Sequence, residues 1–416
     1  MNLKRLFPAL LLTVSSASAQ PSTDGWLDSL IRSGASAFLK QVLDQPDSFR
    51  YQVIYTRIDR DRHNRPHFHS YYLHMDRNLY FNPASTVKLP AALVALEKLH
   101  ALHRRGIDRD TPMVTDSSYS GQTAVAEDTS ARDGLPSVGQ YIRRVFLVSD
   151  NEAYNRLYEF DGQAYLNRSL WRKGYRDVRI TRRFVVMDED QNRHTNAIRL
   201  VKDGRVAYYQ PPAYNTDSFD FSQPVLIGRA HYDWKDSLHA GPMDFTRHNN
   251  LPVEDLARMV RSVMFPASVP RKDRFRLDAK DRRFLLQYMS ELPRESRYPK
   301  YDTSEYFDSY TKFFFFRAGR SEIPSYIRSF NKAGWSYGFL TDAAYLVDFR
   351  NRVEFLVTGT IYVNSDGILN DDRYDYEQIG FPFFREIGQI LYRYECSRIR
   401  KYLPDLSEFK LDYSTE

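Results

Sequence analysis

The chain is poor in cysteine, with a single residue, Cys396, among 416. One thiol excludes an intramolecular disulfide and argues against a zinc site built from several thiolates. A cysteine nucleophile needs a neighbouring base, and no histidine lies near Cys396 in the sequence. The fold must therefore rely on its packed core, and the reactive groups must be sought elsewhere in the chain.

Long apolar runs are also missing, so no membrane-spanning helix is expected. A basic pair at positions 4–5 precedes the apolar run 6–14, which is too short to cross a bilayer, and small residues follow at 17–19. This pattern predicts a signal peptide over residues 1–19. We expect a protein secreted to the bacterial periplasm, with no membrane anchor after signal cleavage.

A clustered basic surface is absent as well. The net charge is +6, and basic residues are interleaved with acidic ones, as over 57–65 and 271–283. Nucleic-acid-binding proteins concentrate positive charge in a patch or carry a recognisable motif, so no nucleic-acid partner is predicted. The length allows two packed cores or one large domain with two lobes.

Several motifs of hydrolases and metalloenzymes are not found. His67 and His69 alternate on a predicted strand, but neither H-x-H-x-D nor H-E-x-x-H occurs, so these histidines are interpreted as structural or surface residues. The absence of G-x-S-x-G argues against an α/β-hydrolase. No metal and no cofactor is predicted.

The apolar pattern predicts strands near both chain ends and helices between them. Alternation favours strands over 51–58, 67–75, 337–349 and 352–363, with a further hairpin over 198–209. Helical spacing is found over 26–43, 85–103, 138–158, 163–171, 253–264, 279–291 and 383–394. This order predicts an α/β (α+β) fold of two lobes, in which both chain ends form a mainly antiparallel sheet and the middle forms a helical lobe.

The first chemical motif is Ser85-Thr86-Val87-Lys88 at the start of a predicted helix. Residues i and i+3 share a helix face, so the hydroxyl and the amine can meet. Lysine can activate a serine when burial or a nearby cation lowers the lysine pKa. The free N–H groups at a helix start can stabilise an oxyanion. Alone, this short pattern also arises by chance.

Two further motifs follow along the chain. Ser149-Asp150-Asn151 offers a hydroxyl for proton transfer and an amide that can hold substrate, although a helix N-cap uses the same residue types. Lys332-Ala333-Gly334, which we expect just before a strand, offers a cation for a carboxylate and a glycine that permits close approach. A turn between strands has a similar composition.

The three motifs together, in this order, resemble the class A β-lactamase-like and penicillin-binding-protein serine hydrolase family over about residues 25–395. The resemblance implies a β-lactamase/transpeptidase-like fold. After the signal peptide, residues 20–416 would form the catalytic domain. Its expected parts are a sheet lobe over about 25–84 and 311–395, and a helical lobe over about 85–310 with an insertion near 185–242.

The resemblance also implies roles for the matched residues. Ser85 would be the nucleophile, Lys88 its base or part of a base relay, and Ser149 the donor of a proton to the leaving nitrogen. Substrate would contact Asn151, Lys332 and Gly334, and the backbone N–H groups of Ser85 and Trp335 would form an oxyanion hole. The expected partner is a small-molecule β-lactam or a peptidoglycan-like peptide, without a cofactor.

Two departures from the family pattern leave the reaction open. Ala333 stands where the family usually has Thr or Ser, and no clean E-x-x-x-N follows the second motif. Asp188, spaced correctly from Asn192, and Glu189 are the candidates for the deacylation base, and a solvated acidic turn fits them equally well. We therefore keep three hypotheses: a serine hydrolase that turns over β-lactams, a peptidoglycan DD-peptidase or penicillin-binding-type enzyme, and a non-catalytic exported binding module.

Overall fold

The computed structural model describes residues 22–102, 106–119, 123–317, 319–320 and 322–414. The predicted signal peptide, residues 1–19, lies outside these residues. Within the described parts of the chain, no helix combines the length and the hydrophobicity needed to span a membrane.

A five-stranded sheet at the centre of the molecule is built from both ends of the chain. Its antiparallel order is β10-β11-β12-β1-β2. The strands are β1 (Gln52–Arg60), β2 (Pro66–Leu73), β10 (Ile327–Ser336), β11 (Phe339–Asp348) and β12 (Val353–Tyr362). This sheet and the helical middle of the chain confirm the predicted two-lobed fold.

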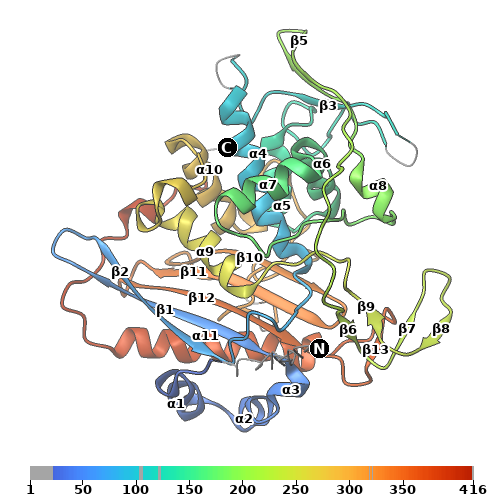
Figure 1. Cartoon of the computed structure of the whole chain (residues 1–416). Coiled ribbons are helices and arrows are strands. Elements are labelled where there is room, and N and C mark those ends of the chain that lie inside the picture. Colours follow the sequence, from blue (N-terminus) through green and yellow to red (C-terminus); the bar gives the residue numbers. More distant parts are fainter. Residues whose placement is uncertain (1–21, 103–105, 120–122, 318, 321, 415–416) are drawn as a thin grey trace, which may run out of the picture.

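One face of the sheet is covered by helices from the two chain ends (Figure 1). These are α1 (Gly25–Gly34), α2 (Ala37–Leu43), α3 (Pro46–Phe49) and α11 (Phe381–Ser397). Their apolar side chains form one core cluster with the sheet, in which Leu27, Phe383 and Ile387 are fully buried. The single helix predicted over 26–43 is wrong, because Ser36 caps α2 through Leu39 N–H and also bonds Glu386 of α11.

The helical lobe covers the other face of the sheet (Figure 1). α4 (Lys88–Leu102) is buried on nearly every side, as expected for a helix that is apolar all round. α9 packs on β11 and β12, and α10 packs on β10. The lobe also contains α5 (Val138–Leu147), α6 (Asn151–Asp161), α7 (Gln163–Arg172), α8 (Glu189–Arg193), α9 (Val253–Met264) and α10 (Ala279–Ser290).

Short strands occupy the predicted insertion and its surroundings. β4 (Ile198–Lys202) and β5 (Arg205–Gln210) form the predicted hairpin, which joins β3 (Met113–Thr115). The remaining strands are β6 (Leu226–Ile227), β7 (Ala230–Tyr232), β8 (Leu238–Ala240), β9 (Met243–Asp244) and β13 (Ile368–Leu369). β6 pairs with β9, while β7 lies between β8 and β13.

The sequence-based position of the third motif needs correction. Lys332, Ala333 and Gly334 lie inside β10, and do not precede a strand. Most of β10 is buried on both faces, so its sequence shows no alternation of polar and apolar residues. Polar residues such as Arg328 and Asn331 are buried there as well, so the pattern of apolar residues in the sequence does not predict the strand.

Candidate active site

Ser85 lies in a 3-10 turn, Ala84–Val87, that leads directly into α4. Asn82 shapes this entry, since its Oδ1 accepts the Ala84 N–H at 3.2 Å and its Nδ2 donates to Ser336 Oγ at 2.8 Å. Ala84 has a φ of 43°, in the left-handed region that non-glycine residues seldom adopt. The surrounding contacts hold this backbone, and Ser85 is presented to a cavity.

Lys88 connects the first motif with the second. It is fully buried on α4, and its Nζ donates to Ser149 O, to Asn151 Oδ1 at 2.7 Å and to Ser149 Oγ at 3.3 Å. Burial lowers the pKa of Lys88 well below its usual range, the charge of Lys332 lowers it further, and Asp150 opposes both. A neutral amine in this position can accept a proton.

The hydroxyl of Ser149 lies between two lysine amines. Lys332 Nζ donates to Ser149 Oγ at 2.9 Å and to Ala333 O, in β10, at 2.6 Å. Burial lowers the pKa of Lys332 to about 7, with Asp342 opposing and Lys312 adding to the shift. The structure therefore brings Lys88, Ser149, Asn151 and Lys332 together, as the motifs predicted.

Gly334 is required where β10 passes the turn that holds Ser85. A Cβ at position 334 would lie 2.6 Å from Ser85 N and 2.9 Å from Thr86 N, closer than real atoms approach. The glycine therefore sets the separation between the strand and the nucleophile. Ser85 and Trp335, whose N–H groups are the predicted oxyanion hole, both line the cavity.

Ala333 points away from this site. Successive side chains of a strand point to opposite faces, so Ala333 lies on the other face of β10 from Lys332. It is fully buried in the apolar cluster below the sheet and does not line the cavity. A hydroxyl at this position would enter that cluster, so the change from Thr or Ser affects packing rather than a carboxylate site.

The predicted deacylation bases are not at the site. Asp188 caps α8, accepting Gln191 N–H at 2.8 Å, and Glu189 pairs with Arg193 and Arg247. Neither carboxylate lines the cavity that contains Ser85. The prediction of Asp188 or Glu189 as the base is therefore wrong for this structure, and the solvated acidic turn is the better interpretation.

The loop at 182–187 presents the side chain of Phe184 to Lys88. Sequence reasoning did not identify this residue. Lys88 Nζ lies 5.2 Å from the centre of the Phe184 ring. The ring is held by a hydrogen bond of 2.8 Å from Phe184 N to Asn155 Oδ1 and by packing on Tyr154. Asn155 lies one helical turn after Asn151 and is buried, and a buried amide needs a hydrogen-bond partner, which the Phe184 N–H supplies.

The cavity around Ser85 has a volume of about 1030 Å³. Its walls come from the motifs, the loop at 182–187, the end of β10 and the predicted insertion. From the insertion and its support the lining includes His231, Tyr232, Asp233, Trp234, Met243, Asp244, His248 and Asn370. No local pattern predicts that these residues line the same cavity as Ser85, because their position depends on how the insertion folds back.

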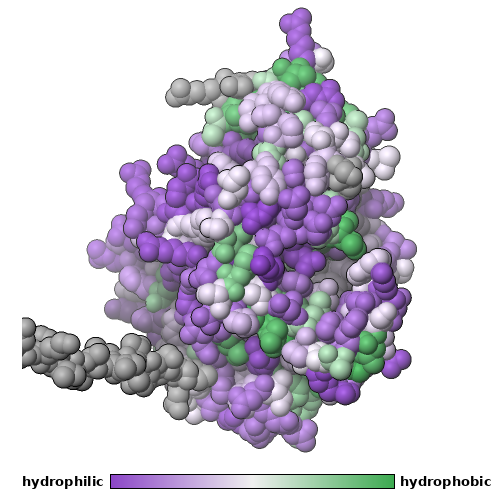
Figure 2. All heavy atoms as spheres, turned by 45° about the vertical axis from the view of Figure 1, so that its right-hand side comes forward, coloured by the Kyte–Doolittle hydropathy of each residue, from purple (hydrophilic) through white to green (hydrophobic). Residues whose placement is uncertain are grey.

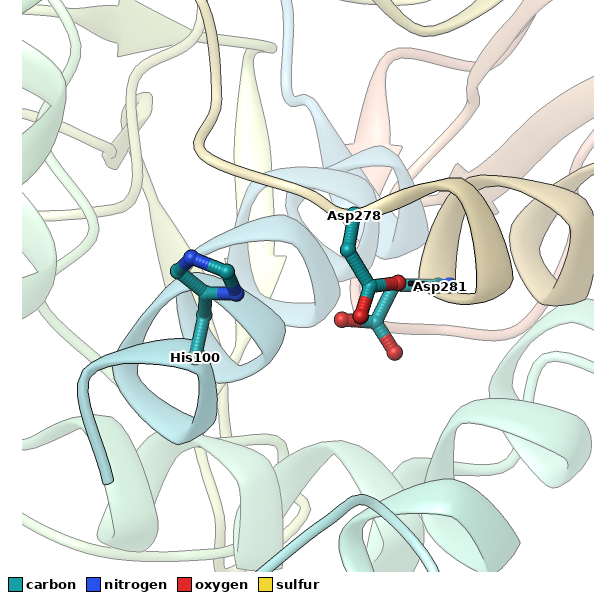
Figure 3. A group of neighbouring side chains, drawn as sticks. All are labelled: His100, Asp278 and Asp281. Atoms are coloured by element: carbon teal, nitrogen blue, oxygen red, sulfur yellow. Dashed lines mark hydrogen bonds between the residues drawn. The ribbon is translucent and has the colours of Figure 1, made fainter. Parts of the chain in front are cut away.

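A second cluster of potential ligands lies away from this cavity, and Figure 3 shows it at the ends of α4 and α10. Within the described residues, His100, Asp278 and Asp281 bring three ligand atoms within 4.8 Å of one another. Asp278 accepts Asp281 N–H at 2.7 Å as a helix cap, and Asp281 accepts Arg109 Nη1 at 3.0 Å. These protein partners account for both carboxylates, and no metal is assigned to the cluster.

Comparison with known proteins agrees with the motifs. Residues 58–205 match the model of the beta-lactamase enzyme family, and this stretch contains the Ser85 and Ser149 motifs. None of the curated proteins matches the chain. The matched stretch and the three motifs are thus similar to those of the β-lactamase-like serine hydrolases.

Solved structures are similar at low identity. A β-lactamase from Xanthomonas campestris pv. campestris is 14% identical, with 88% of this chain and 97% of that chain covered and a TM-score of 0.48. The β-lactamase from Streptomyces albus G is 14% identical, with coverages of 87% and 98% and a TM-score of 0.46. A variant of PBP-A, solved as an acyl-enzyme with penicillin G, is 13% identical, with coverages of 88% and 96% and a TM-score of 0.46.

Proposed function

We propose that this protein is an exported serine enzyme that forms an acyl-enzyme on Ser85 with β-lactams or related acyl-D-amino-acid amides, and that releases the acyl group slowly. The proposal is carried by one observation: hydrogen bonds join Lys88 to Asn151 and Lys332 to Ser149, while the loop side chain that faces Lys88 is the phenyl ring of Phe184. This combination favours a penicillin-binding type of enzyme over rapid β-lactam turnover.

The acylation step follows from the positions of the amines. The neutral amine of Lys88 takes the Ser85 hydroxyl proton, and Oγ bonds to the substrate carbonyl carbon. The backbone N–H groups of Ser85 and Trp335 would hold the resulting oxyanion. As the carbon–nitrogen bond breaks, Ser149 gives its proton to the leaving nitrogen. Lys88, which took the proton of Ser85, then reprotonates Ser149. Protonated Lys332 would bind the substrate carboxylate.

Deacylation requires a base that activates water. Among the described residues, the carboxylates that line the cavity are Asp233, in the predicted insertion, and Asp244, just after it. The hydrogen bond from His239 and the N–H groups of Ser237 and Lys235 lower the pKa of Asp233 to about 2. Hydrogen bonds from Thr246 lower the pKa of Asp244. Carboxylates with depressed pKa values are weak general bases, which supports a long-lived acyl-enzyme.

Export is part of the proposal and rests on the basic, apolar and small-residue pattern over residues 1–19. A periplasmic location would give the enzyme access to peptidoglycan-like peptides and to β-lactams. Mass determination of the secreted protein checks this, with cleavage after Ala19 as the expected result.

The test of the reaction uses the mature protein and a Ser85→Ala variant with a chromogenic cephalosporin. Absorbance reports opening of the β-lactam ring, and intact mass reports the adduct over the same time course. We expect ring opening of one equivalent per enzyme and a persistent adduct in the wild type only. Many turnovers would instead establish a β-lactamase. No adduct and no turnover would overturn the serine mechanism and favour the non-catalytic binding module.

A further inference from the structure

The Ser85 cavity extends along β10 toward residues 226–244, here called the wall segment, which comprise β6 to β9. Lys332 marks one end of the site, and Gly334 lies against the backbone of Ser85. Ser336, the last residue of β10, lies four residues beyond Lys332, or about 13 Å along the strand, and Tyr337 follows it. The ring of Tyr337 contacts Phe245, 5.4 Å away between centroids, at the end of the wall segment. The wall segment therefore lies on the far side of Ser85 from Lys332.

The wall segment is docked firmly onto the chain that follows β12. β7 pairs with β13, and Arg229 N donates to Gly367 O at 2.8 Å. Gly228 packs so closely that a Cβ there would lie 2.8 Å from Gly367 O. Asn370 Nδ2 also donates to Tyr232 O at 3.1 Å. A wall segment held in this way is preformed, so a ligand that binds to it would not bear the entropic cost of ordering the segment.

The wall exposes apolar surface toward the cavity. Trp234 lines the cavity and keeps 80% of its surface accessible, and Val186, on the loop that also carries Phe184, lines it with 90% accessible. Figure 2 turns this side of the molecule forward, and hydrophobic atoms are exposed there in patches among hydrophilic ones. Exposed apolar groups inside a cavity that also contains a nucleophile are typical of a substrate-binding surface.

The two ends of the cavity thus differ in chemistry. Ser149, which lines the cavity, is hydrogen-bonded to buried Lys332 and Lys88, so this end suits a negative group, and the indole of Trp234 suits an apolar group at the other. A substrate bonded to Ser85 with its carboxylate on Lys332 extends its remaining substituent toward the wall segment.

We propose that Trp234 and the wall segment form a subsite for an aromatic or extended apolar substituent on the acyl side of the substrate. This inference rests on the proposed acyl-enzyme. Lys235 Nζ lies over the ring, 4.8 Å from the indole centre, and Trp234 keeps 80% of its surface accessible, which suits stacking of a ligand ring.

The test compares two penicillins that differ only by one phenyl ring, benzylpenicillin and 6-acetamidopenicillanic acid. The second-order rate of Ser85 acylation is measured by intact mass. We expect Trp234→Ala to slow acylation by benzylpenicillin about tenfold and to change acylation by the acetamido compound less than twofold. Trp234→Phe should retain most of the preference. Because Trp234 is largely exposed, its removal leaves the core intact.

Leu238→Ala is the matched control, because Leu238 is an exposed apolar residue of β8 that does not line the cavity. It should leave both rates unchanged. Equal slowing of both penicillins by Trp234→Ala, or an unchanged preference, would overturn the subsite while the acyl-enzyme stands. Failure of the wild type to react with either compound would overturn the proposed function and the subsite with it.

Discussion

Replacing Gly334 by alanine probes the spacing between β10 and the nucleophile. The new Cβ would lie 2.6 Å from Ser85 N and 3.1 Å from Ser85 Cα, and both are backbone atoms that no rotamer change can move away. Relief to ordinary contact requires a shift of about 1 Å. A misplacement of that size costs about 100-fold in rate when it lies at the reacting groups.

The effect on stability should be smaller than the effect on rate. Overpacking of a well-packed site costs about 1–3 kcal/mol. The reduced freedom of the unfolded chain with alanine offsets about 0.4–1 kcal/mol of this cost. We therefore expect the Gly334→Ala variant to fold, with a modest decrease in the free energy of unfolding measured in urea, and to lose most of its acylation.

The assay is the rate of adduct formation with the chromogenic cephalosporin, followed by intact mass. Gly25→Ala is the control, since a Cβ at position 25 meets no atom within 4 Å. The control should acylate at the wild-type rate. Acylation of Gly334→Ala within twofold of the wild type would show that the close approach of β10 to Ser85 does not control the reaction.

The remaining predictions concern the loop, the charge of Lys332 and the core. Phe184→Glu places a carboxylate beside Lys88, so continuous cephalosporin turnover should replace the persistent adduct; an unchanged adduct lifetime would contradict this. The pKa of Lys332 is about 7, so its charge is lost as the pH rises through 7, and acylation by a carboxylate-bearing substrate should decline there; Lys332→Ala should lack this alkaline limb. Glu354→Ala leaves buried Arg60 unpaired and should lower the free energy of unfolding by about 3–5 kcal/mol, read from urea denaturation, while Asp217→Ala at an exposed ion pair should change it by less than about 1 kcal/mol.

The parts of the fold that the sequence predicts are those with local signals. β1 and β2 lie where alternation is visible, and α9 has the expected helical apolar face. β10 was missed because both of its faces are buried and it carries buried polar residues. Its position depends on pairing with β11, and the break before α2 depends on the contact of Ser36 with Glu386, neither of which is local in sequence.

The candidate site likewise has residues that local sequence patterns predict and residues whose position depends on distant contacts. Short motifs located Ser85, Lys88, Ser149 and Lys332, because their chemistry restricts the residue types and spacing. The role of Phe184 could not be read in advance, since it depends on which part of the 182–187 loop Asn155 holds against Lys88. The wall segment was equally hidden, because its place in the cavity is set by pairing with β13 far along the chain.

The charges buried behind Lys332 bear on the proposed binding of an anionic substrate. Lys312 Nζ donates to Asn331 Oδ1 at 2.7 Å, and Asn331 Nδ2 donates to Asp342 Oδ1 at 2.7 Å. Asp342 is fully buried, and burial raises its pKa to about 6, while burial lowers the pKa of Lys312 to about 7. The charge of Asp342 thus acts on two buried lysines, Lys312 and Lys332. Buried charges are costly without partners, so a substrate carboxylate at Lys332 would supply the missing negative charge and stabilise its ammonium form.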